Sequence, residues 1–395
     1  MTKGLPAMTI TVTAATSTWT TAADLPAAAT WSGQHDGALT LADGTVLVLG
    51  GADATNAAVN RTAIFDPVAG TWHPAAPMGS PRQGYTATLL TDGRVLVTGG
   101  VSGSAPGTPP VATAELYDPA KQQWTATGML SDPRAGHSAA LLPDGTVLVA
   151  GGTAVRDGQT TMALRTAERY HPDTGQWSPA AAMTDARTGH TAIALDGGAV
   201  LVCGGTVPVG TDDDAALAFC ELYDQAADRW APTGSLHRGR RHHQATRVSG
   251  GTVLITGGTA PGAPGGGPFD PFAQRTAELY DLASGTWQAV ADMPSGRGLH
   301  RAVPLAAGQV LVVGGAASDR DEAGYRSAVR YDVTAATWTP VAGLTTGRWG
   351  FAAAVLADGR VLVTGGIARS GLAAADPSGV ELTTQTEIFA PGTAS

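Results

Sequence analysis

Residues 134–152 read RAGHSAALLPDGTVLVAGG, and the features of this segment recur along the chain. An Arg-x-Gly-His opening leads into a small apolar run, an Asp-Gly turn, and a second apolar run that ends in a glycine doublet. Asp-Gly between two apolar runs predicts a tight hairpin, because glycine accepts the positive φ that such turns require. The second run is continuous, which is typical of a strand buried on both faces.

The glycine doublet occurs seven times, at intervals of about 50 residues. Each doublet is followed by a loop and by a strand that ends in an aromatic residue, and a Trp stands seven residues after the first six aromatics. The doublets begin at Gly50, Gly99, Gly151, Gly204, Gly257, Gly314 and Gly365. The aromatic and Trp positions are Phe65 and Trp72, Tyr117 and Trp124, Tyr170 and Trp177, Tyr223 and Trp230, Tyr280 and Trp287, and Tyr331 and Trp338. This period predicts four-stranded antiparallel units, the blades of a β-propeller.

The seventh unit reaches its aromatic residue at Phe389 but has no Trp after it, whereas Trp19 has no aromatic partner before it. We therefore expect residues 9–22 to supply the last strand of blade seven and to close the ring, which removes exposed sheet edges. The fold class predicted for residues 1–395 is an all-β, seven-bladed propeller forming a single domain, with flexible ends at residues 1–8 and 391–395.

Doublet, aromatic and Trp at fixed spacing make every unit resemble the kelch repeat, over nearly the whole chain. The resemblance implies that a ligand or partner binds around the mouth of the central channel, on the face of the loops that follow the doublets. These loops vary in length, and variable loops on a rigid scaffold are where sites are built. The turns on the opposite face are short and uniform.

The composition sets limits on partners. A net charge of −9 argues against nucleic acid as a bulk electrostatic partner, and no apolar stretch is long enough to span a membrane. The first residues lack the basic and apolar layout of a signal peptide. We expect a soluble, cytoplasmic monomer with no membrane partner. Cys203 and Cys220, on neighbouring strands of blade four, are expected to be buried thiols, with a disulfide as the alternative.

An arginine opens six of the seven units, and Gly33 is assigned to that position in blade one. The six are Arg82, Arg134, Arg187, Arg240, Arg297 and Arg348. A ring of guanidinium groups at the channel mouth would bind a carboxylate, a phosphate or an acidic peptide. The alternative is that each arginine pairs with a carboxylate of its own blade, at Glu115, Glu168, Glu221, Glu278 or Glu387.

A histidine occupies one further repeat position in four blades, at His137, His190, His243 and His300, where the other blades carry Asp36, Tyr85 and Phe351. Zinc or iron needs ligands that converge within about 2.0–2.2 Å of one point, and equivalent positions on different blades are spread around the channel. We expect these histidines to be structural, and we predict no metal and no cofactor. The chain also resembles neither the kelch-fold oxidases with a copper-bound Tyr-Cys pair nor the iron-dependent plant kelch proteins in their metal-binding motifs.

Departures from the repeat are the better site candidates. Blade five contains Arg240, Arg241, His242 and His243 in sequence, and its loop carries Phe269 and Phe272. An Asp triplet lies at residues 212–214 in the loop of blade four, and the charged segment Asp-Arg-Asp-Glu lies at residues 319–322 in the loop of blade six. Further candidates on the same face are Tyr325, Trp349, Trp31 and His35. The alternative is that these are ordinary solvated loops.

From these residues we predict a small ligand with a carboxylate or phosphate, bound by Arg240, Arg297, His300, Arg348, Trp349, Tyr325, Trp31, His35, Phe269 and Phe272. If the protein is an enzyme, His242, His243 and Arg241 would carry proton transfer of an isomerase, lyase or cyclase type. Kelch-type sialic-acid epimerases are a precedent by resemblance. The alternatives are a protein-interaction scaffold, as in kelch adaptors, and a carbohydrate-binding propeller that uses the aromatic side chains.

Overall fold

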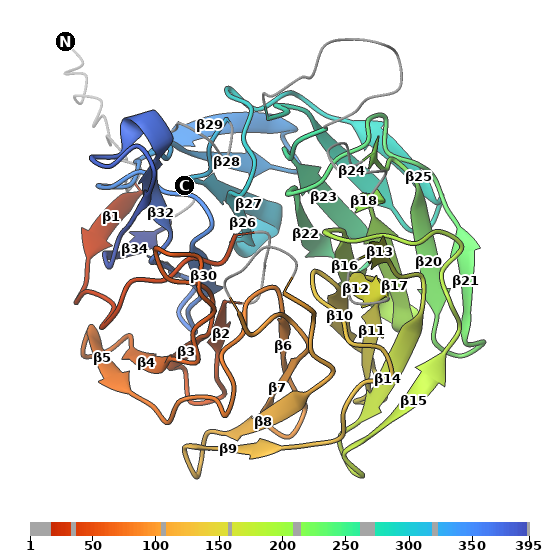
Figure 1. Ribbon diagram of the computed structural model, residues 1–395. Helices are drawn as coiled ribbons and strands as arrows, with labels where there is room; N and C mark the ends of the chain where they lie inside the picture. The colour runs from red at the N-terminus through yellow and green to blue at the C-terminus, as the bar shows by residue number, and fades with distance from the viewer. Residues whose placement is uncertain are drawn as a thin grey trace, which may run out of the picture.

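The computed structural model describes residues 17–32, 37–103, 108–156, 160–207, 215–260, 273–317 and 323–392. Within these ranges, seven four-stranded antiparallel sheets surround a central axis, and Figure 1 shows them as the blades of a closed disc. The predicted all-β, seven-bladed propeller is confirmed. Of the ends predicted to be flexible, residues 1–8 and 393–395 lie outside the described residues.

Each blade runs outward from the axis, from its first strand to its fourth. Blade one contains β2 (Ala38–Thr40), β3 (Val46–Leu49), β4 (Thr62–Asp66) and β5 (Thr71–Pro74), and blade two contains β6 (Thr86–Leu89), β7 (Val95–Thr98), β8 (Ala114–Asp118) and β9 (Gln123–Ala126). Blade three contains β10 (Ser138–Leu141), β11 (Val147–Ala150), β14 (Ala167–His171) and β15 (Gln176–Ala180). Blade four contains β16 (Thr191–Ala194), β17 (Ala199–Cys203), β20 (Cys220–Asp224) and β21 (Arg229–Pro232). Blade five contains β22 (Gln244–Ser249), β23 (Thr252–Thr256), β24 (Ala277–Asp281) and β25 (Thr286–Ala289). Blade six contains β26 (Arg301–Pro304), β27 (Gln309–Val313), β28 (Ala328–Asp332) and β29 (Thr337–Val341). Blade seven contains β30 (Ala352–Val355), β31 (Val361–Thr364), β34 (Thr386–Ala390) and β1 (Thr18–Thr21).

Within the described residues, three loops that follow a glycine doublet form hairpins of their own, in blades three, four and seven. They are β12 (Thr153–Arg156) with β13 (Thr160–Ala163), β18 (Thr206–Val207) with β19 (Ala215–Ala216), and β32 (Ile367–Ser370) with β33 (Val380–Leu382). Short 3₁₀ turns lie at η1 (Asp196–Gly198), η2 (Ala306–Gly308) and η3 (Gly371–Ala373).

The ring closes as predicted, because the N-terminal strand β1 pairs with the C-terminal strand β34. Trp19 lies opposite Phe389, and their ring centroids are 5.1 Å apart. The closing strand is shorter than the predicted segment 9–22, since it covers only Thr18–Thr21, and residues 9–16 lie outside the described part of the chain.

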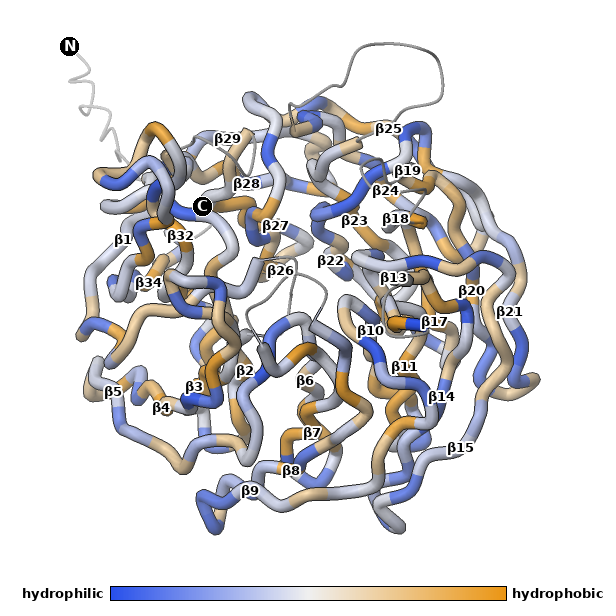
Figure 2. Tube along the Cα trace, viewed as in Figure 1, coloured by the Kyte–Doolittle hydropathy of each residue, from blue (hydrophilic) through white to orange (hydrophobic). Residues whose placement is uncertain are grey.

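The second strand of each blade is the most buried one, since neighbouring blades cover both of its faces. All four residues of β7 are at most 1% exposed, and Figure 2 shows the hydrophobic colour along β7 and β11. The Trp of the fourth strand joins adjacent blades: its ring packs on the aromatic residue of the third strand, and its indole N–H donates to a carbonyl of the preceding blade. Trp124, for example, packs on Tyr117 and donates to the Ala76 carbonyl at 2.9 Å.

The glycine doublets are required by backbone conformation and by close approach. At Gly99 and Gly100 the φ angles are 65° and 89°, in the left-handed region that favours glycine. A Cβ on Gly99 would lie 2.5 Å from the Arg134 carbonyl oxygen and 2.6 Å from Cε1 of His137. The doublet therefore lets the opening of the next blade pack directly against the strand end.

Candidate functional site

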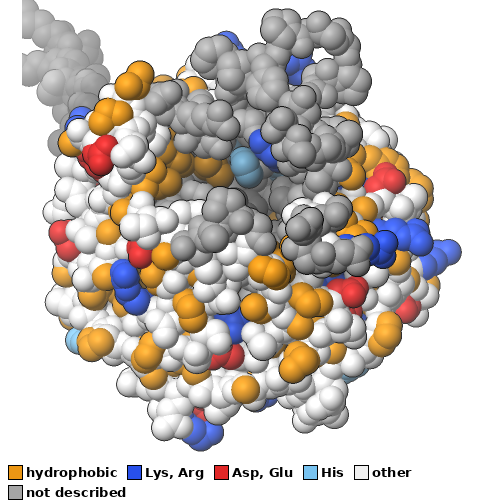
Figure 3. All heavy atoms as spheres, in the orientation of Figure 1, with side chains coloured by type: hydrophobic (Ala, Val, Ile, Leu, Met, Phe, Trp, Pro, Cys, Tyr) orange, Lys and Arg blue, Asp and Glu red, His pale blue; other side chains and the backbone are white. Residues whose placement is uncertain are grey.

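The first strands of the blades line a central cavity of about 450 Å³. Its wall is largely apolar, with Ile193, Val303 and Val355 towards the end where the first strands finish. The other end opens between the starts of these strands, on the face of the post-doublet loops. Figure 3 views this face and shows a hollow at its centre, with histidine and Lys or Arg atoms at the edge.

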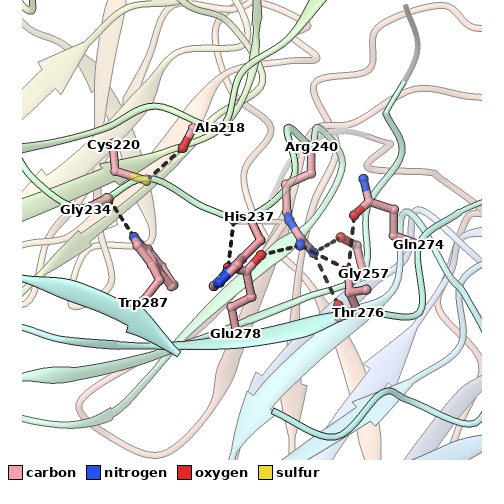
Figure 4. A network of polar contacts seen from close by, with 10 residues as sticks. All are labelled: Ala218, Cys220, Gly234, His237, Arg240, Gly257, Gln274, Thr276, Glu278 and Trp287. Carbon is pink, nitrogen blue, oxygen red and sulfur yellow. Dashed lines mark hydrogen bonds and ion pairs between the residues drawn. The ribbon is translucent and has the colours of Figure 1, made fainter. Parts of the chain in front are cut away.

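The repeat arginines do not line this cavity, because they point into the blades. Arg240 is 0% exposed, and its Nη2 donates to Glu278 Oε1 at 2.7 Å while Nη1 donates to the carbonyls of Gly257 and Thr276 (Figure 4). The same pairing joins Arg82 to Glu115, Arg134 to Glu168, Arg187 to Glu221 and Arg348 to Glu387. The carboxylate-pairing alternative is thus confirmed for five arginines.

This burial corrects the ligand-binding roles predicted for Arg240 and Arg348, whose guanidinium groups do not reach the channel mouth. Arg297 is also 0% exposed, although no carboxylate of a described residue pairs with it. The physical reason is local: the arginine side chain folds back over the start of its own blade and satisfies carbonyls that the glycine turn leaves exposed there.

The repeat histidines are structural, as predicted. Nε2 of His137, His190 and His243 lies 2.8–3.0 Å from the hydroxyl groups of Thr86, Ser138 and Thr191, each on the preceding blade. His300 bonds in the same way to Thr256 at 2.8 Å. Burial, with the nearby Arg134, lowers the pKa of His137 to about 3, so this ring is neutral near pH 7.

His243 and His300 are both 0% exposed. This corrects the roles predicted for them in catalysis and ligand binding, because neither imidazole reaches the cavity surface. Sequence alone separates His242 from His243 only as an extra residue beside a repeat residue, and the structure supports that distinction.

One backbone residue from each of several blades forms a hydrogen-bonded rim around the channel mouth. Gly136 donates to the Gly84 carbonyl, Gly189 to Gly136, Leu299 to His242, Gly350 to Leu299 and Trp31 to Gly350. His242 occupies this rim position with φ = 53°, where glycine stands in four other blades. Its side chain is partly exposed.

Arg241 adjoins His242 and is also partly exposed, and its backbone pairs with Thr259 as an isolated bridge. Of the predicted catalytic residues, the structure therefore places His242 in the hydrogen-bonded rim, with Arg241 beside it in the chain, and His243 inside the blades.

The predicted aromatic wall is mostly core. Trp31 and Trp349 are 2% and 1% exposed. The indole N–H of Trp31 donates to the Leu49 carbonyl at 2.8 Å, and its ring packs on the doublet of blade seven where other blades place the histidine. Tyr325 is partly exposed, and its ring centroid lies 5.6 Å from Cζ of Arg297. His35, Phe269 and Phe272, and the charged segments at 212–214 and 319–322, lie outside the described residues.

Blade one departs from the predicted alignment. The N–H of Gly366 donates to the Ala29 carbonyl, as Gly100 donates to Arg134. Ala29, rather than Gly33, therefore holds the arginine position. The misassignment arises because extra residues separate Trp31 from β2, so counting back from the strand leads to the wrong residue.

Sequence reasoning missed Arg301, the first residue of β26. Its side chain lines the central cavity although the residue is only 4% exposed. Nη2 donates to the Trp31 carbonyl at 3.4 Å, and Cζ lies 5.7 Å from the Phe351 ring centroid. The signal was available, since the same repeat position is occupied in the other blades by shorter, uncharged side chains: Thr86, Ser138, Thr191, Gln244 and Ala352.

Comparison with known proteins agrees with this architecture. A family model described as the Attractin/LZTR1 β-propeller matches residues 3–262. The chain belongs to this kelch-type propeller family. Kelch-like protein 25 of Xenopus tropicalis is 26% identical over 253 residues, which are 63% of this chain and 39% of that protein. Human Kelch-like protein 34 is 30% identical over 166 residues, 42% of this chain and 24% of that protein. The chain thus spans well under half the length of these relatives.

Solved structures that share the fold include an oxidase and YjhT. A fungal alcohol oxidase of the AA5 family, in complex with copper, superposes with a TM-score of 0.72 at 20% identity, over 95% of this chain and 76% of the oxidase. YjhT superposes with a TM-score of 0.58 at 17% identity, over 80% of this chain and 96% of YjhT.

This kelch-type propeller has both cysteines in register, Cys203 on β17 opposite Cys220 on β20, and both are free and buried thiols. Burial raises the pKa of Cys203, while its hydrogen bond to Cys220 lowers the pKa of Cys220.

Across the described ranges, no group of three or more His, Cys, Asp or Glu side chains is arranged to hold a metal ion. Nor does any helix among those residues have the length and apolar character needed to cross a membrane.

A second cavity of this propeller, about 580 Å³, opens on the post-doublet face where blades seven, one and two meet. Its lining mixes polar side chains, with Ser32, Asn56, Gln83 and Ser378 among them, and apolar ones such as Ile367. It lies next to the channel rim, since Gly84 and Trp31 belong to both.

Proposed function

We propose that this propeller binds a small ligand with a carboxylate or phosphate in its central channel, and that Arg301 contacts the anionic group. The observation that supports this is the position of Arg301: a guanidinium group in the wall of a cavity of about 450 Å³, where the other blades have uncharged side chains. A guanidinium group in a partly dehydrated cavity binds oxyanions with charge-assisted hydrogen bonds.

The rest of the wall indicates the kind of molecule that fits. Gln244 lies in the wall close to the start of its strand, as Arg301 does, and adds an amide that can donate or accept. Ala192, Ile193 and Val303 make the deeper wall apolar. This arrangement suits a ligand with an apolar body and one anionic end.

If the protein is an enzyme, His242 is our candidate for proton transfer of an isomerase, lyase or cyclase type. It is partly exposed at the rim, whereas His137, His190, His243 and His300 are buried and bonded to hydroxyl groups. Arg241 beside it would hold a second oxygen of the ligand.

The test is a panel of small carboxylates and phosphates measured by thermal shift and calorimetry. We expect at least one to bind the wild-type protein and to lose at least tenfold in affinity in Arg301→Gln. Arg229→Gln is the matched control, because Arg229 is a surface residue whose side chain is 71% exposed. Equal affinity of the wild type and Arg301→Gln for every binder would contradict the proposal.

A protein-interaction scaffold is the second candidate. It is favoured by the match to Kelch-like protein 25 over 63% of the chain, and by the three hairpins that add surface to the post-doublet face. If a protein partner binds through these hairpins, its affinity should be unchanged in Arg301→Gln and should fall when the β32–β33 hairpin is shortened. These two variants therefore distinguish the two candidate functions.

A further inference from the structure

Blade six breaks the arginine–glutamate pairing that the other arginine-bearing blades share. In those blades the glutamate lies on the third strand, always at the same position relative to the second strand. Glu115 of β8, for example, lies opposite Val97 of β7. In blade six that position is Val329, opposite Val312. The arginine is nevertheless present as Arg297.

A second change accompanies the first. In the paired blades, the other carboxylate oxygen accepts a backbone N–H from the residue three before the arginine; Gly79 donates to Glu115 Oε2 at 2.6 Å, and Thr184 donates to Glu221 Oε2 at 2.8 Å. In blade six the residue at this place is Pro294, which has no N–H. The carboxylate and its backbone donor are therefore both absent, so blade six is built without a carboxylate here.

The Arg297 guanidinium is left with neutral acceptors only, among the residues described. Its Nη1 donates to the carbonyls of Gly314 and Ser327 at 3.0 and 3.1 Å, and its Nη2 donates to Ser295 Oγ at 2.8 Å and Ser327 Oγ at 3.0 Å. The residue is 0% exposed. A buried charge without a counter-charge is costly, which makes this position attractive to an anion. Consistent with this cost, burial lowers the pKa of Arg297 to about 10.

The two serines connect the buried charge to solvent. Ser327 is exposed and Ser295 is partly exposed. Each hydroxyl oxygen accepts a hydrogen bond from Nη2, so each O–H proton is available to donate outward. Two O–H donors beside one guanidinium group therefore form a binding position for a small anion, which would accept both hydrogen bonds.

We propose that Arg297, Ser295 and Ser327 form a site for a small monovalent anion such as chloride, which replaces the missing glutamate of blade six. The anion accepts hydrogen bonds from the two hydroxyl groups, and the guanidinium neutralises its charge. None of these three residues lines the central cavity, so this site is independent of the proposed ligand in the channel.

The test is thermal unfolding while chloride replaces gluconate at constant ionic strength. We expect the wild-type melting temperature to rise by about 1–3 °C between 0 and 0.5 M chloride, by mass action on the folded state. Val329→Glu supplies the carboxylate of the other blades, and we expect it to abolish the chloride response. Ser295→Ala/Ser327→Ala removes the hydroxyl donors instead, and it keeps the test decisive if Val329→Glu does not fold.

Crystals grown with bromide provide a direct readout. We expect an anomalous peak beside the hydroxyl groups of Ser295 and Ser327 in the wild type and none there in the serine double variant. A chloride response that persists unchanged in both variants, or the lack of a bromide peak at this position in the wild type, would overturn the proposal.

Discussion

At the scale of single residues, Arg187 and Glu221 form one of the buried ion pairs of this propeller. Both side chains are 0% exposed, and Nη2 of the arginine lies 3.1 Å from the carboxylate. The carboxylate also accepts two backbone N–H bonds, from Thr184 and Asp185. A buried pair of this kind is costly to break from one side, because the remaining charge is left without a partner.

We therefore predict that Glu221→Gln lowers the free energy of unfolding by about 3 kcal/mol or more. Urea or thermal unfolding would measure the change. Lys121→Gln is the control: its ion pair with Asp118 is at the surface, with the lysine side chain 72% exposed, and its loss should cost less than about 1 kcal/mol. Similar losses in the two variants would show that the buried pair contributes no more than a surface pair.

The buried histidines predict a dependence of stability on pH. The pKa of His137 falls from 6.5 to about 3 on folding, so between these values the unfolded chain binds more protons than the folded one. The contribution of the neutral His137 ring to the free energy of unfolding is therefore fully present above pH 6.5. It is lost at about 1.4 kcal/mol per pH unit as the pH falls towards 3.

His137→Tyr should make this slope shallower, since Tyr85 fills the same repeat position in blade two. Urea unfolding at pH 7, 6 and 5 would measure the slope. The same slope in the variant and in the wild type would assign the pH dependence to other groups.

At the scale of secondary-structure elements, closure depends on a single short strand. β1 (Thr18–Thr21) covers the edge of β34, and the indole N–H of Trp19 donates to the Ala342 carbonyl of blade six at 2.6 Å. This strand thus joins the two ends of the sequence and also bonds to the neighbouring blade. Without it, blade seven would have three strands and an exposed edge.

We predict that deletion of residues 1–22 lowers the melting temperature of the whole propeller and promotes aggregation. Deletion of residues 1–16 is the matched control, because it leaves β1 complete, and it should melt like the full chain. Calorimetry of both truncations would measure this. A 1–22 deletion that melts at the temperature of the full chain would refute the role of β1 in closure.

At the scale of the whole molecule, the rim of the channel mouth is assembled from single residues of different blades. Leu299 and His242 both have φ = 53° at this position, but Leu299 is 7% exposed and packs with Trp349 and Ile367, whereas His242 is partly exposed. A left-handed conformation costs a non-glycine residue about 1–2 kcal/mol. Packing offsets that cost for Leu299. His242 bears the same cost with its side chain partly exposed, which makes it a candidate for binding or catalysis at the channel mouth.

We predict that His242→Gly raises the free energy of unfolding by about 1 kcal/mol and impairs ligand binding or turnover at the channel mouth. His242→Ala, which keeps the strained backbone, should impair function without the gain in stability. Denaturant unfolding and a binding assay on both variants would measure this. Full activity in both variants would remove His242 from the site.

The number of blades, the pairing of aromatic residues with Trp, and closure by Trp19 could be predicted from the sequence, because each depends on local spacing along the chain. The directions of the polar side chains could not be predicted in this way, because they depend on contacts between strands and blades. Arg240 and Arg301 both stand near the start of a first strand, yet Arg240 lies inside its blade and Arg301 lines the channel. The physical reason is that glutamates, carbonyl groups and aromatic rings supplied by other strands and blades compete for each guanidinium group. Spacing within one repeat does not contain that information.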